Sequence, residues 1–160
     1  MDERKTIAET EEEIIGEFSL LESWDEKYEY IIELGKKLSA LDDIFKTGEN
    51  IVRGCQSTVW LSAEYRDGLM IYKADSDAII VKGLISMLIR VLSNHSPDEI
   101  IGAKLDFIRT IGMTTHLAQT RSNGLLSMVR QMKNYALAYK IKYGNSSEDN
   151  GYGNAKTESH

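Results

Sequence analysis

Residues 59–92 read VWLSAEYRDGLMIYKADSDAIIVKGLISMLIRVL and contain the clearest structural signals of the chain. Residues 59–65 alternate between apolar and other side chains in a β-prone composition, which is typical of a strand. Asp67-Gly68 is a strong hairpin signal, and residues 69–74 supply a returning strand. The sequence therefore predicts an antiparallel hairpin.

The segment after the hairpin, residues 79–92, is apolar nearly all round. This composition is typical of a central, buried helix. Asp75, Ser76 and Asp77 stand just before it, and we expect their side chains to cap its first turn. A role for Asp75 and Asp77 at a functional site is the alternative.

Capping boxes indicate helices on both sides of this unit. Thr10 with Glu13 and Ser23 with Glu26 predict two N-terminal helices, the second over about residues 24–38. The periodicity stops over residues 39–55, which predicts a long irregular loop of a kind that is often functional.

Two more helices are predicted after the central one. Ser96 and Pro97 with Glu99 indicate a short helix, and a last helix is predicted to start near Ser122. The apolar side of that helix comprises Leu125, Met128, Val129, Met132, Ala136 and Tyr139. The fold class is therefore α+β, a small antiparallel β-sheet packed against several α-helices.

Length and composition limit the class of protein. The 160 residues, 42% hydrophobic and 28% charged, suit one globular domain, which we assign to residues 1–142. Residues 143–160 are rich in Gly, Asn and Ser and are expected to form a disordered tail. The net charge of −6 argues against nucleic acid as a partner. No apolar stretch is long enough for a membrane span, and one cysteine with a charged N-terminus favours the reducing cytoplasm.

Cys55 is the single cysteine and the one soft nucleophile of the chain. A free cysteine is usually a small buried side chain, and that interpretation stays open. Three neighbours favour chemistry instead: Gly54 frees the backbone, Arg53 would favour the thiolate, and Gln56 and Ser57 are polar.

A hydrolase based on Cys55 would need a base, and outside the tail the chain offers His95 and His116. His95 lies in a predicted turn, where we expect it to be exposed. His116 would approach Cys55 only through the fold. The spacing of these residues matches no zinc site, and no glycine-rich loop predicts a nucleotide site.

A dense polar run, residues 119–125, opens the last predicted helix. Ser122 or Asn123 would cap it, or Arg121 would steer an anion or a docking partner. Both interpretations remain open from the residues alone.

Several motifs occur together in order: Trp24 to Gly35, then Gly54-Cys-Gln-Ser57 with Val59-Trp60, Asp75-Ser-Asp77, Val81-Lys-Gly-Leu84 and Arg121-Ser-Asn-Gly-Leu125. On these motifs the sequence closely resembles the SufE family of sulfur acceptors over roughly residues 12 to 135. It departs from the usual pattern at residues 37–41 and 118–120, where the family commonly has proline.

The resemblance implies that Cys55 accepts sulfane sulfur from the persulfide of a cysteine desulfurase, which uses pyridoxal phosphate. That partner would be SufS-like or, as in the related CsdE branch, CsdA-like, and the sulfur would pass to a Suf-type scaffold for iron–sulfur cluster assembly. No cofactor or metal of the protein's own is expected, and the chain would be a carrier and activator rather than a stand-alone enzyme. Residues expected to shape or dock the site are Arg53, Gly54, Gln56, Ser57, Asp75, Asp77, His116 and Arg121.

Sulfur transfer between cysteines needs only an attacking thiolate, a leaving thiolate and close approach. We expect Cys55 to rest turned inward and to swing outward about Gly54 on docking. The alternatives are an interaction module that regulates a partner without chemistry, or a hydrolase that uses Cys55 and His116.

Overall fold

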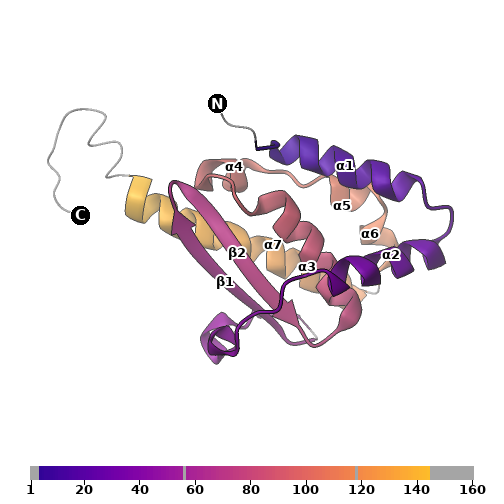
Figure 1. Ribbon diagram of the computed structural model, residues 1–160, viewed down its shortest axis with the longest axis horizontal. Coiled ribbons are helices and arrows are strands. Elements are labelled where there is room, and N and C mark those ends of the chain that lie inside the picture. Colours follow the sequence, from indigo (N-terminus) through magenta and orange to yellow (C-terminus); the bar gives the residue numbers. More distant parts are fainter. Residues whose placement is uncertain (1–3, 56, 118, 145–160) are drawn as a thin grey trace, which may run out of the picture.

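The computed structural model describes residues 4–55, 57–117 and 119–144. The elements are α1 (Ile7–Ser19), α2 (Trp24–Lys36), the 3-10 turns η1 (Asp43–Phe45) and η2 (Gly48–Asn50), β1 (Val59–Arg66), β2 (Leu69–Ser76), α3 (Ile79–Leu92), α4 (Pro97–Gly102), α5 (Phe107–Thr110), α6 (Met113–His116), α7 (Gln119–Tyr139) and the π turn η3 (Lys140–Gly144). The hairpin lies across α3 and α7, and α1 and α2 lie farther out on α3 (Figure 1). The predicted α+β class is confirmed. The expected tail falls almost entirely on residues 145–160, outside the described residues.

The hairpin forms as predicted, and β2 continues to Ser76. Its register pairs Val59 with Ser76 and Arg66 with Leu69 around the Asp67-Gly68 turn. Both turn residues have positive φ, 55° and 84°, as the favoured hairpin turn requires. Buried residues on one face of the sheet, Val59, Leu61, Met70, Tyr72 and Ala74, join the core.

Helix α3 has the predicted bounds and is the centre of the core, with seven residues buried: Gly83, Leu84, Ile85, Met87, Leu88, Val91 and Leu92. Gly83 lies directly against α2, because a Cβ at this position would be 2.0 Å from the carbonyl oxygen of Ile31. This close approach explains why the Val81-Lys-Gly-Leu84 motif contains a glycine.

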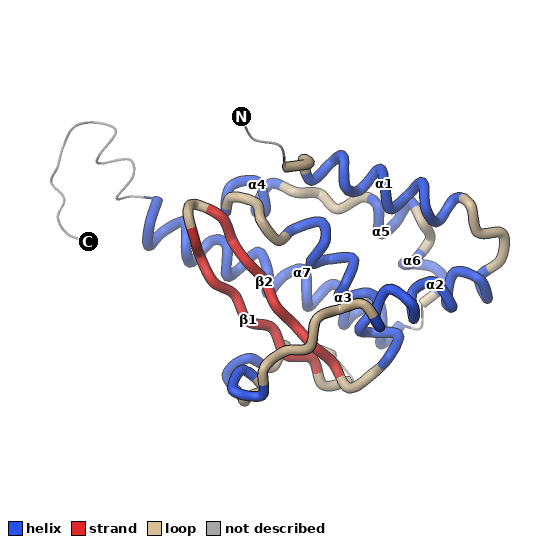
Figure 2. Tube along the Cα trace, viewed as in Figure 1, coloured by secondary structure: helices blue, strands red, loops and turns tan. Residues whose placement is uncertain are grey.

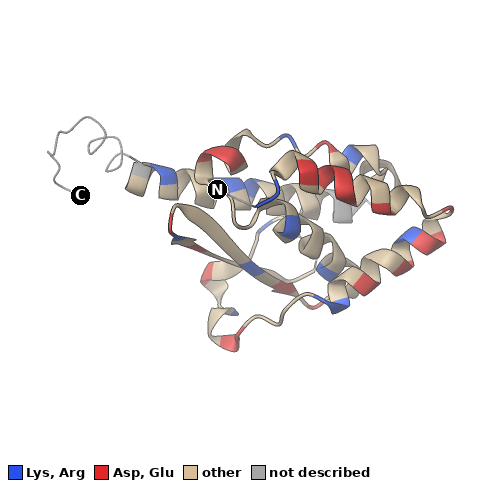
Figure 3. Cartoon of the chain, turned by 45° about the horizontal axis from the view of Figure 1, so that its top comes forward, with Lys and Arg blue, Asp and Glu red and all other residues tan. Residues whose placement is uncertain are grey.

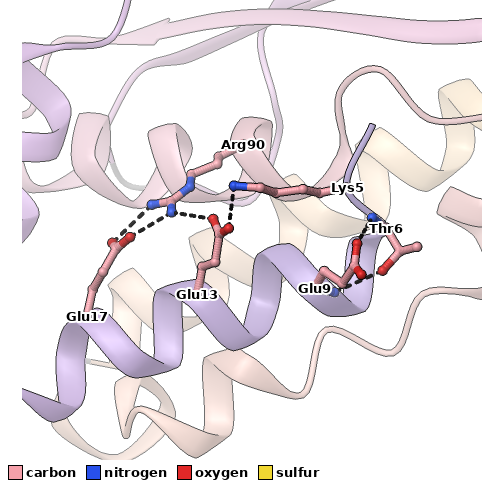
Figure 4. A network of polar contacts seen from close by, with 6 residues as sticks. All are labelled: Lys5, Thr6, Glu9, Glu13, Glu17 and Arg90. Carbon is pink, nitrogen blue, oxygen red and sulfur yellow. Dashed lines mark hydrogen bonds and ion pairs between the residues drawn. The ribbon is translucent and has the colours of Figure 1, made fainter. Parts of the chain in front are cut away.

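Helix α1 begins earlier than predicted. Its cap is Thr6, whose hydroxyl accepts from the Glu9 amide while the Glu9 carboxylate accepts from the Thr6 amide (Figure 4). The prediction of a cap at Thr10 was wrong, because Thr10 is buried on the inner face of α1. The same pattern of Thr followed by Glu three residues later fits both positions, and packing selects the earlier one.

An ion-pair network joins α1 to α3 (Figure 4). Arg90 donates to Glu17 at 2.7 and 3.0 Å and to Glu13 at 3.1 Å, and Lys5 pairs with Glu13. The hydrogen bond from Arg90 holds the pKa of Glu17 below its usual value. Burial and the bond to Glu17 raise the pKa of Tyr30 to about 12.

The outer sides of the two strands receive backbone partners from neighbouring segments. Val52 N–H donates to Val59 of β1 at 2.9 Å, and Met70 of β2 exchanges bonds with Asn94 and His95 at 2.7 and 2.8 Å. These bonds hold His95 beside β2, where it is 4% exposed. The expectation of an exposed histidine was wrong. Its Nδ1 lies 3.3 Å from Arg4 Nη1 and 3.5 Å from Glu99 Oε1. Arg4 is far from His95 in the sequence, so the local pattern around the turn gave no sign of this contact.

Helix α4 has the predicted capping box of Ser96 and Glu99 with Pro97 in its first turn. Helix α7 carries the predicted apolar residues, but it begins at Gln119, earlier than the predicted start near Ser122. Ser122 and Asn123 therefore lie inside the helix and are not its N-cap. No helix in the described part of the chain is both long and apolar enough to cross a membrane.

Candidate functional site

Cys55 lies in the loop that connects η2 to β1, and this loop rests on α7. The segment that precedes it leaves α2 and crosses the strands near the open end of the hairpin (Figure 2). Gly54 has φ +91°, and a Cβ there would lie 2.4 Å from Ser127 Oγ. The positive φ favours glycine at this position, and a Cβ here would also require the Ser127 hydroxyl to turn away. The expected role of Gly54 as a hinge stays a prediction.

The thiol of Cys55 is half-buried against the apolar core. Its Sγ donates to the carbonyl oxygen of Gly124 at 3.6 Å. Burial raises the pKa of the Cys55 thiol, so the resting group is a protonated thiol. Arg53 is exposed, and it is not a cause of this shift. A role of Arg53 in favouring the thiolate, which was expected for the exposed loop, stays a prediction.

Asp75 anchors the polypeptide that leads to this loop. Its side chain is 8% exposed, and the carboxylate lies 3.3 Å from Lys46 Nζ and 3.6 Å from Lys82 Nζ. Burial alone would raise the pKa of Asp75, but the Ser76 amide and the two lysines outweigh it and lower the pKa. The predicted capping role of Asp75 was wrong, because the carboxylate binds a lysine from a distant loop instead.

Asp77 and Ser76 bind the other end of the Cys55 loop. The Asp77 carboxylate accepts from the Thr58 amide at 3.2 Å, and Ser76 Oγ donates to the Thr58 carbonyl at 2.8 Å. The N-cap of α3 is Ala78, without a side-chain cap. Asp77 was therefore wrongly predicted as a cap, and the motif from 75 to 77 connects the loop to the start of α3.

His116 packs on Trp24 and not on the thiol. The two rings stack with centroids 4.3 Å apart and planes at 17°, and Tyr28 donates its hydroxyl to the His116 carbonyl at 2.7 Å. Among the described residues, no hydrogen bond or ion pair joins His116 to Cys55. The arrangement lacks the nucleophile–base contact that a cysteine hydrolase uses.

The remaining predicted site residues lie close to Cys55 in sequence or at the start of α7. Ser57 is half-buried. Gln56 lies outside the described residues, and Arg121 is in the first turn of α7, where its side chain lies outside the description.

Gly124, Ser127, Lys46 and Lys82 are site residues that sequence reasoning missed. Gly124 is 69 positions from Cys55, and no local pattern indicates that contact. Its place in the Arg121–Leu125 motif was the one available signal.

The distribution of charged and metal-ligating side chains completes the description of the site. Acidic side chains are numerous on α1 and α2 (Figure 3). Within residues 4–55, 57–117 and 119–144, no three His, Cys, Asp or Glu side chains are grouped so that they could hold a metal ion. The described candidate site is therefore a single thiol seated between a loop and a helix.

Comparison with known proteins gives the family. Residues 12–136 match the SufE family, described as an Fe–S metabolism associated domain. An uncharacterised SufE-like protein of Rhizobium meliloti is 38% identical over 130 residues, covering 78% of this chain and 93% of the relative. SufE-like protein 1 of Arabidopsis thaliana, chloroplastic/mitochondrial, is 38% identical over 132 residues, covering 82% of this chain and 36% of the plant protein.

A solved structure has the same fold. The solution structure of a hypothetical protein from Thermus thermophilus aligns with a TM-score of 0.66 at 17% identity, covering 81% of this chain and 94% of that one. The match over most of the chain, together with relatives at this level of identity, confirms the resemblance stated above. The chain belongs to the SufE family.

Proposed function

We propose that this protein accepts sulfane sulfur on Cys55 from a cysteine desulfurase and passes it on for iron–sulfur cluster assembly. The observation that carries the proposal is the seat of the single cysteine. Cys55 occupies a loop that begins at a positive-φ glycine and rests on α7. Membership of a family associated with Fe–S metabolism supports the same role.

The transfer is a thiol–persulfide exchange. The Cys55 thiolate attacks the outer sulfur of the partner's persulfide, and the partner's S–S bond breaks as a new S–S bond forms on Cys55. The partner's cysteine leaves as a thiolate, and the proton of the Cys55 thiol passes to solvent or to a base of the partner. No external oxidant or reductant is consumed, and no cofactor on this chain is needed.

The resting thiol is protected and the docked thiol is reactive. Burial raises the pKa of Cys55, so the resting protein holds little of the thiolate that attacks. Movement of the loop about Gly54 would bring the sulfur into water, which removes that penalty, or into the desulfurase, where a cation of the partner would favour the thiolate. The thiol is then reactive toward the partner's persulfide, and while the loop is at rest it is less reactive toward other electrophiles.

We place the docking surface of the partner around the loop. Exposed apolar side chains occur on the loop and on the elements next to it: Ile44, Ile51, Ile79 and Leu126. Exposed apolar side chains are a common feature of protein interaction sites when they gather into a patch. The partner that fits the chemistry is a SufS-like or CsdA-like desulfurase, and the acceptor of the product is a Suf-type scaffold.

The test is incubation with each desulfurase, cysteine and pyridoxal phosphate, followed by mass spectrometry. The wild-type protein should gain the mass of sulfur on Cys55 and should increase desulfurase turnover. Cys55→Ser should still bind the desulfurase but should not increase turnover. An interaction module without chemistry would stimulate equally after this substitution, and that result would refute the proposal.

A further inference from the structure

A polar hollow of about 270 Å³ lies between the start of α1 and the end of α3. Arg4 and Lys5 line it from the segment before α1, Thr10 and Glu13 line it from α1, and Arg90 lines it from α3. The turn that follows α3 completes the lining. Figure 4 shows Lys5, Glu13 and Arg90 at this place. Its described lining includes no residue of the Cys55 loop or of α7.

Thr10 contributes a buried hydroxyl group to this hollow. The residue is 5% exposed, and its backbone amide donates to Thr6 as the helix requires. Within the described part of the chain, the hydroxyl of Thr10 has no hydrogen-bond partner. A buried hydroxyl without a partner is unfavourable, and valine has nearly the same volume without this cost. Packing alone therefore does not explain a threonine at this position.

The carboxylate that lines the hollow is already engaged. Glu13 accepts from Lys5 and, at 3.1 Å, from Arg90 (Figure 4). Arg4 Nη1 lies on the other side, 3.3 Å from Nδ1 of His95. Three cationic side chains thus line the hollow against one carboxylate, counted over the described residues.

Hydrogen-bond donors are also in excess here. An ammonium group has more donors than the one that Lys5 gives to Glu13, and the guanidinium of Arg90 keeps donors after it binds Glu13 and Glu17. A water molecule would satisfy the Thr10 hydroxyl but would bring further hydrogens into this group of donors. An anion brings only acceptors.

We infer that this hollow is a binding site for a small tetrahedral oxyanion of the phosphate or sulfate class. The donors come from three segments of the chain, so the ligand needs oxygens that point in several directions. A tetrahedral oxyanion has such oxygens, and a planar carboxylate does not. The Thr10 hydroxyl donates to one oxygen, while Lys5 and Arg90 supply charge-assisted hydrogen bonds. The inference does not rest on the proposed function of Cys55.

Neighbouring carboxylates limit the affinity. Glu17 lies 2.7 Å from Arg90 and Glu99 lies 3.9 Å from Arg4, so part of the positive charge is compensated. The side chain of Lys5 is exposed to solvent, where salt screens its charge. Binding in the millimolar range is therefore expected, and it should weaken as salt is added.

The experiment titrates the full-length protein with sodium phosphate and sodium sulfate by isothermal titration calorimetry, at an ionic strength kept constant with sodium chloride. Sodium acetate tests the preference for a tetrahedral ion, and glycerol 3-phosphate tests whether the phosphate is accepted as an ester. Thr10→Val removes the hydroxyl and Lys5→Gln removes a charge. Lys36→Gln is the matched control, because Lys36 also pairs with a helical glutamate, Glu33 at 3.1 Å, but lies on α2.

We expect saturable binding of phosphate and sulfate and weaker binding of acetate. Thr10→Val should weaken phosphate binding about tenfold, Lys5→Gln should also weaken it, and Lys36→Gln should leave it unchanged. Urea unfolding without phosphate separates binding from folding. Thr10→Val should then be at least as stable as the wild-type protein, because it replaces a buried hydroxyl that has no partner in the fold. Binding of glycerol 3-phosphate as well would support the same site with an ester as its ligand.

Several results would overturn the inference. One is a wild-type protein that shows no saturable binding of either oxyanion, and another is acetate binding as tight as that of phosphate. A third is a Thr10→Val protein that binds phosphate like the wild type or is less stable without it. Equal weakening by Lys36→Gln and Lys5→Gln would also contradict the site, since it would reflect only the total charge of the protein.

Discussion

Replacing Asp75 with asparagine removes the charge that holds Lys46, in the segment leading to the Cys55 loop, to the body of the protein. The carboxylate is 8% exposed and faces Lys46 at 3.3 Å and Lys82 at 3.6 Å. It also accepts from the Ser76 amide at 2.8 Å. Asparagine keeps the size and one acceptor oxygen, so the substitution tests the charge more than the shape.

The magnitude follows from opposing terms. At an effective dielectric constant of about 20, each lysine attracts the carboxylate by about 5 kcal/mol, but removing the carboxylate from water costs several kcal/mol. The lysines, 29% and 37% exposed, recover hydration when the charge is removed. The net loss in the free energy of unfolding should be about 2 kcal/mol, which lowers Tm by about 4–8 °C.

The assay is urea unfolding of the wild-type protein, Asp75→Asn and Asp43→Asn. Asp43 is a matched control because it also pairs with Lys46, at 3.8 Å, but is 96% exposed. We expect no measurable change for the control and faster iodoacetamide alkylation of Cys55 in Asp75→Asn. If Asp75→Asn were no less stable than Asp43→Asn, the assignment of Asp75 as an anchor would be wrong.

The same pair predicts a pH dependence. Because the folded pKa of Asp75 lies below its ordinary value, the stabilisation is complete above about pH 4 and is lost as the pH falls through the folded pKa. The wild-type protein and Asp75→Asn should therefore converge in stability at strongly acidic pH. A constant difference between them down to the lowest pH would contradict the sign of this shift.

Three other measurements check separate parts of the structure. Alkylation of Cys55 should show a midpoint above the ordinary thiol pKa of about 8.5, since burial raises its pKa, and the midpoint should fall in denaturant; a folded-state midpoint at or below 8.5 would contradict this. Arg90→Met should lower the free energy of unfolding by about 1 kcal/mol, with a smaller effect at high salt; an effect that does not depend on salt would argue against the ion pairs. Tyr72→Phe removes the buried 2.6 Å hydrogen bond to the Met132 carbonyl and should lower the free energy of unfolding in urea by about 1 kcal/mol. An unchanged free energy of unfolding would mean that this hydrogen bond does not stabilise the fold.

The parts of the fold that the sequence predicted are those with strong local patterns. The hairpin turn at Asp67-Gly68 and the bounds of α3 follow from turn chemistry and from a continuous apolar segment. The start of α1 was missed because Thr6 and Thr10 both begin a capping pattern. The choice between them depends on which face packs against α3.

The site was predictable only as far as its motifs. Cys55 and Gly54 could be identified from the sequence, whereas their seat on Gly124 and Ser127 depends on how the loop meets α7. Asp75 was predicted as a helix cap because it stands with Ser76 and Asp77 just before the apolar segment that forms α3. Lys46, its partner, comes from a loop whose position is set only by the tertiary fold.

Within the described residues the sheet has two strands, so each of them has a neighbouring strand on one side. An unpaired strand side is a template on which another polypeptide can add, and aggregation commonly starts there. Residue 52 occupies part of that template on β1, and residues 94 and 95 occupy part of it on β2. A loop excursion large enough to release residue 52 would uncover β1, so mobility at this site brings a solubility risk that bound partners or brief openings would limit.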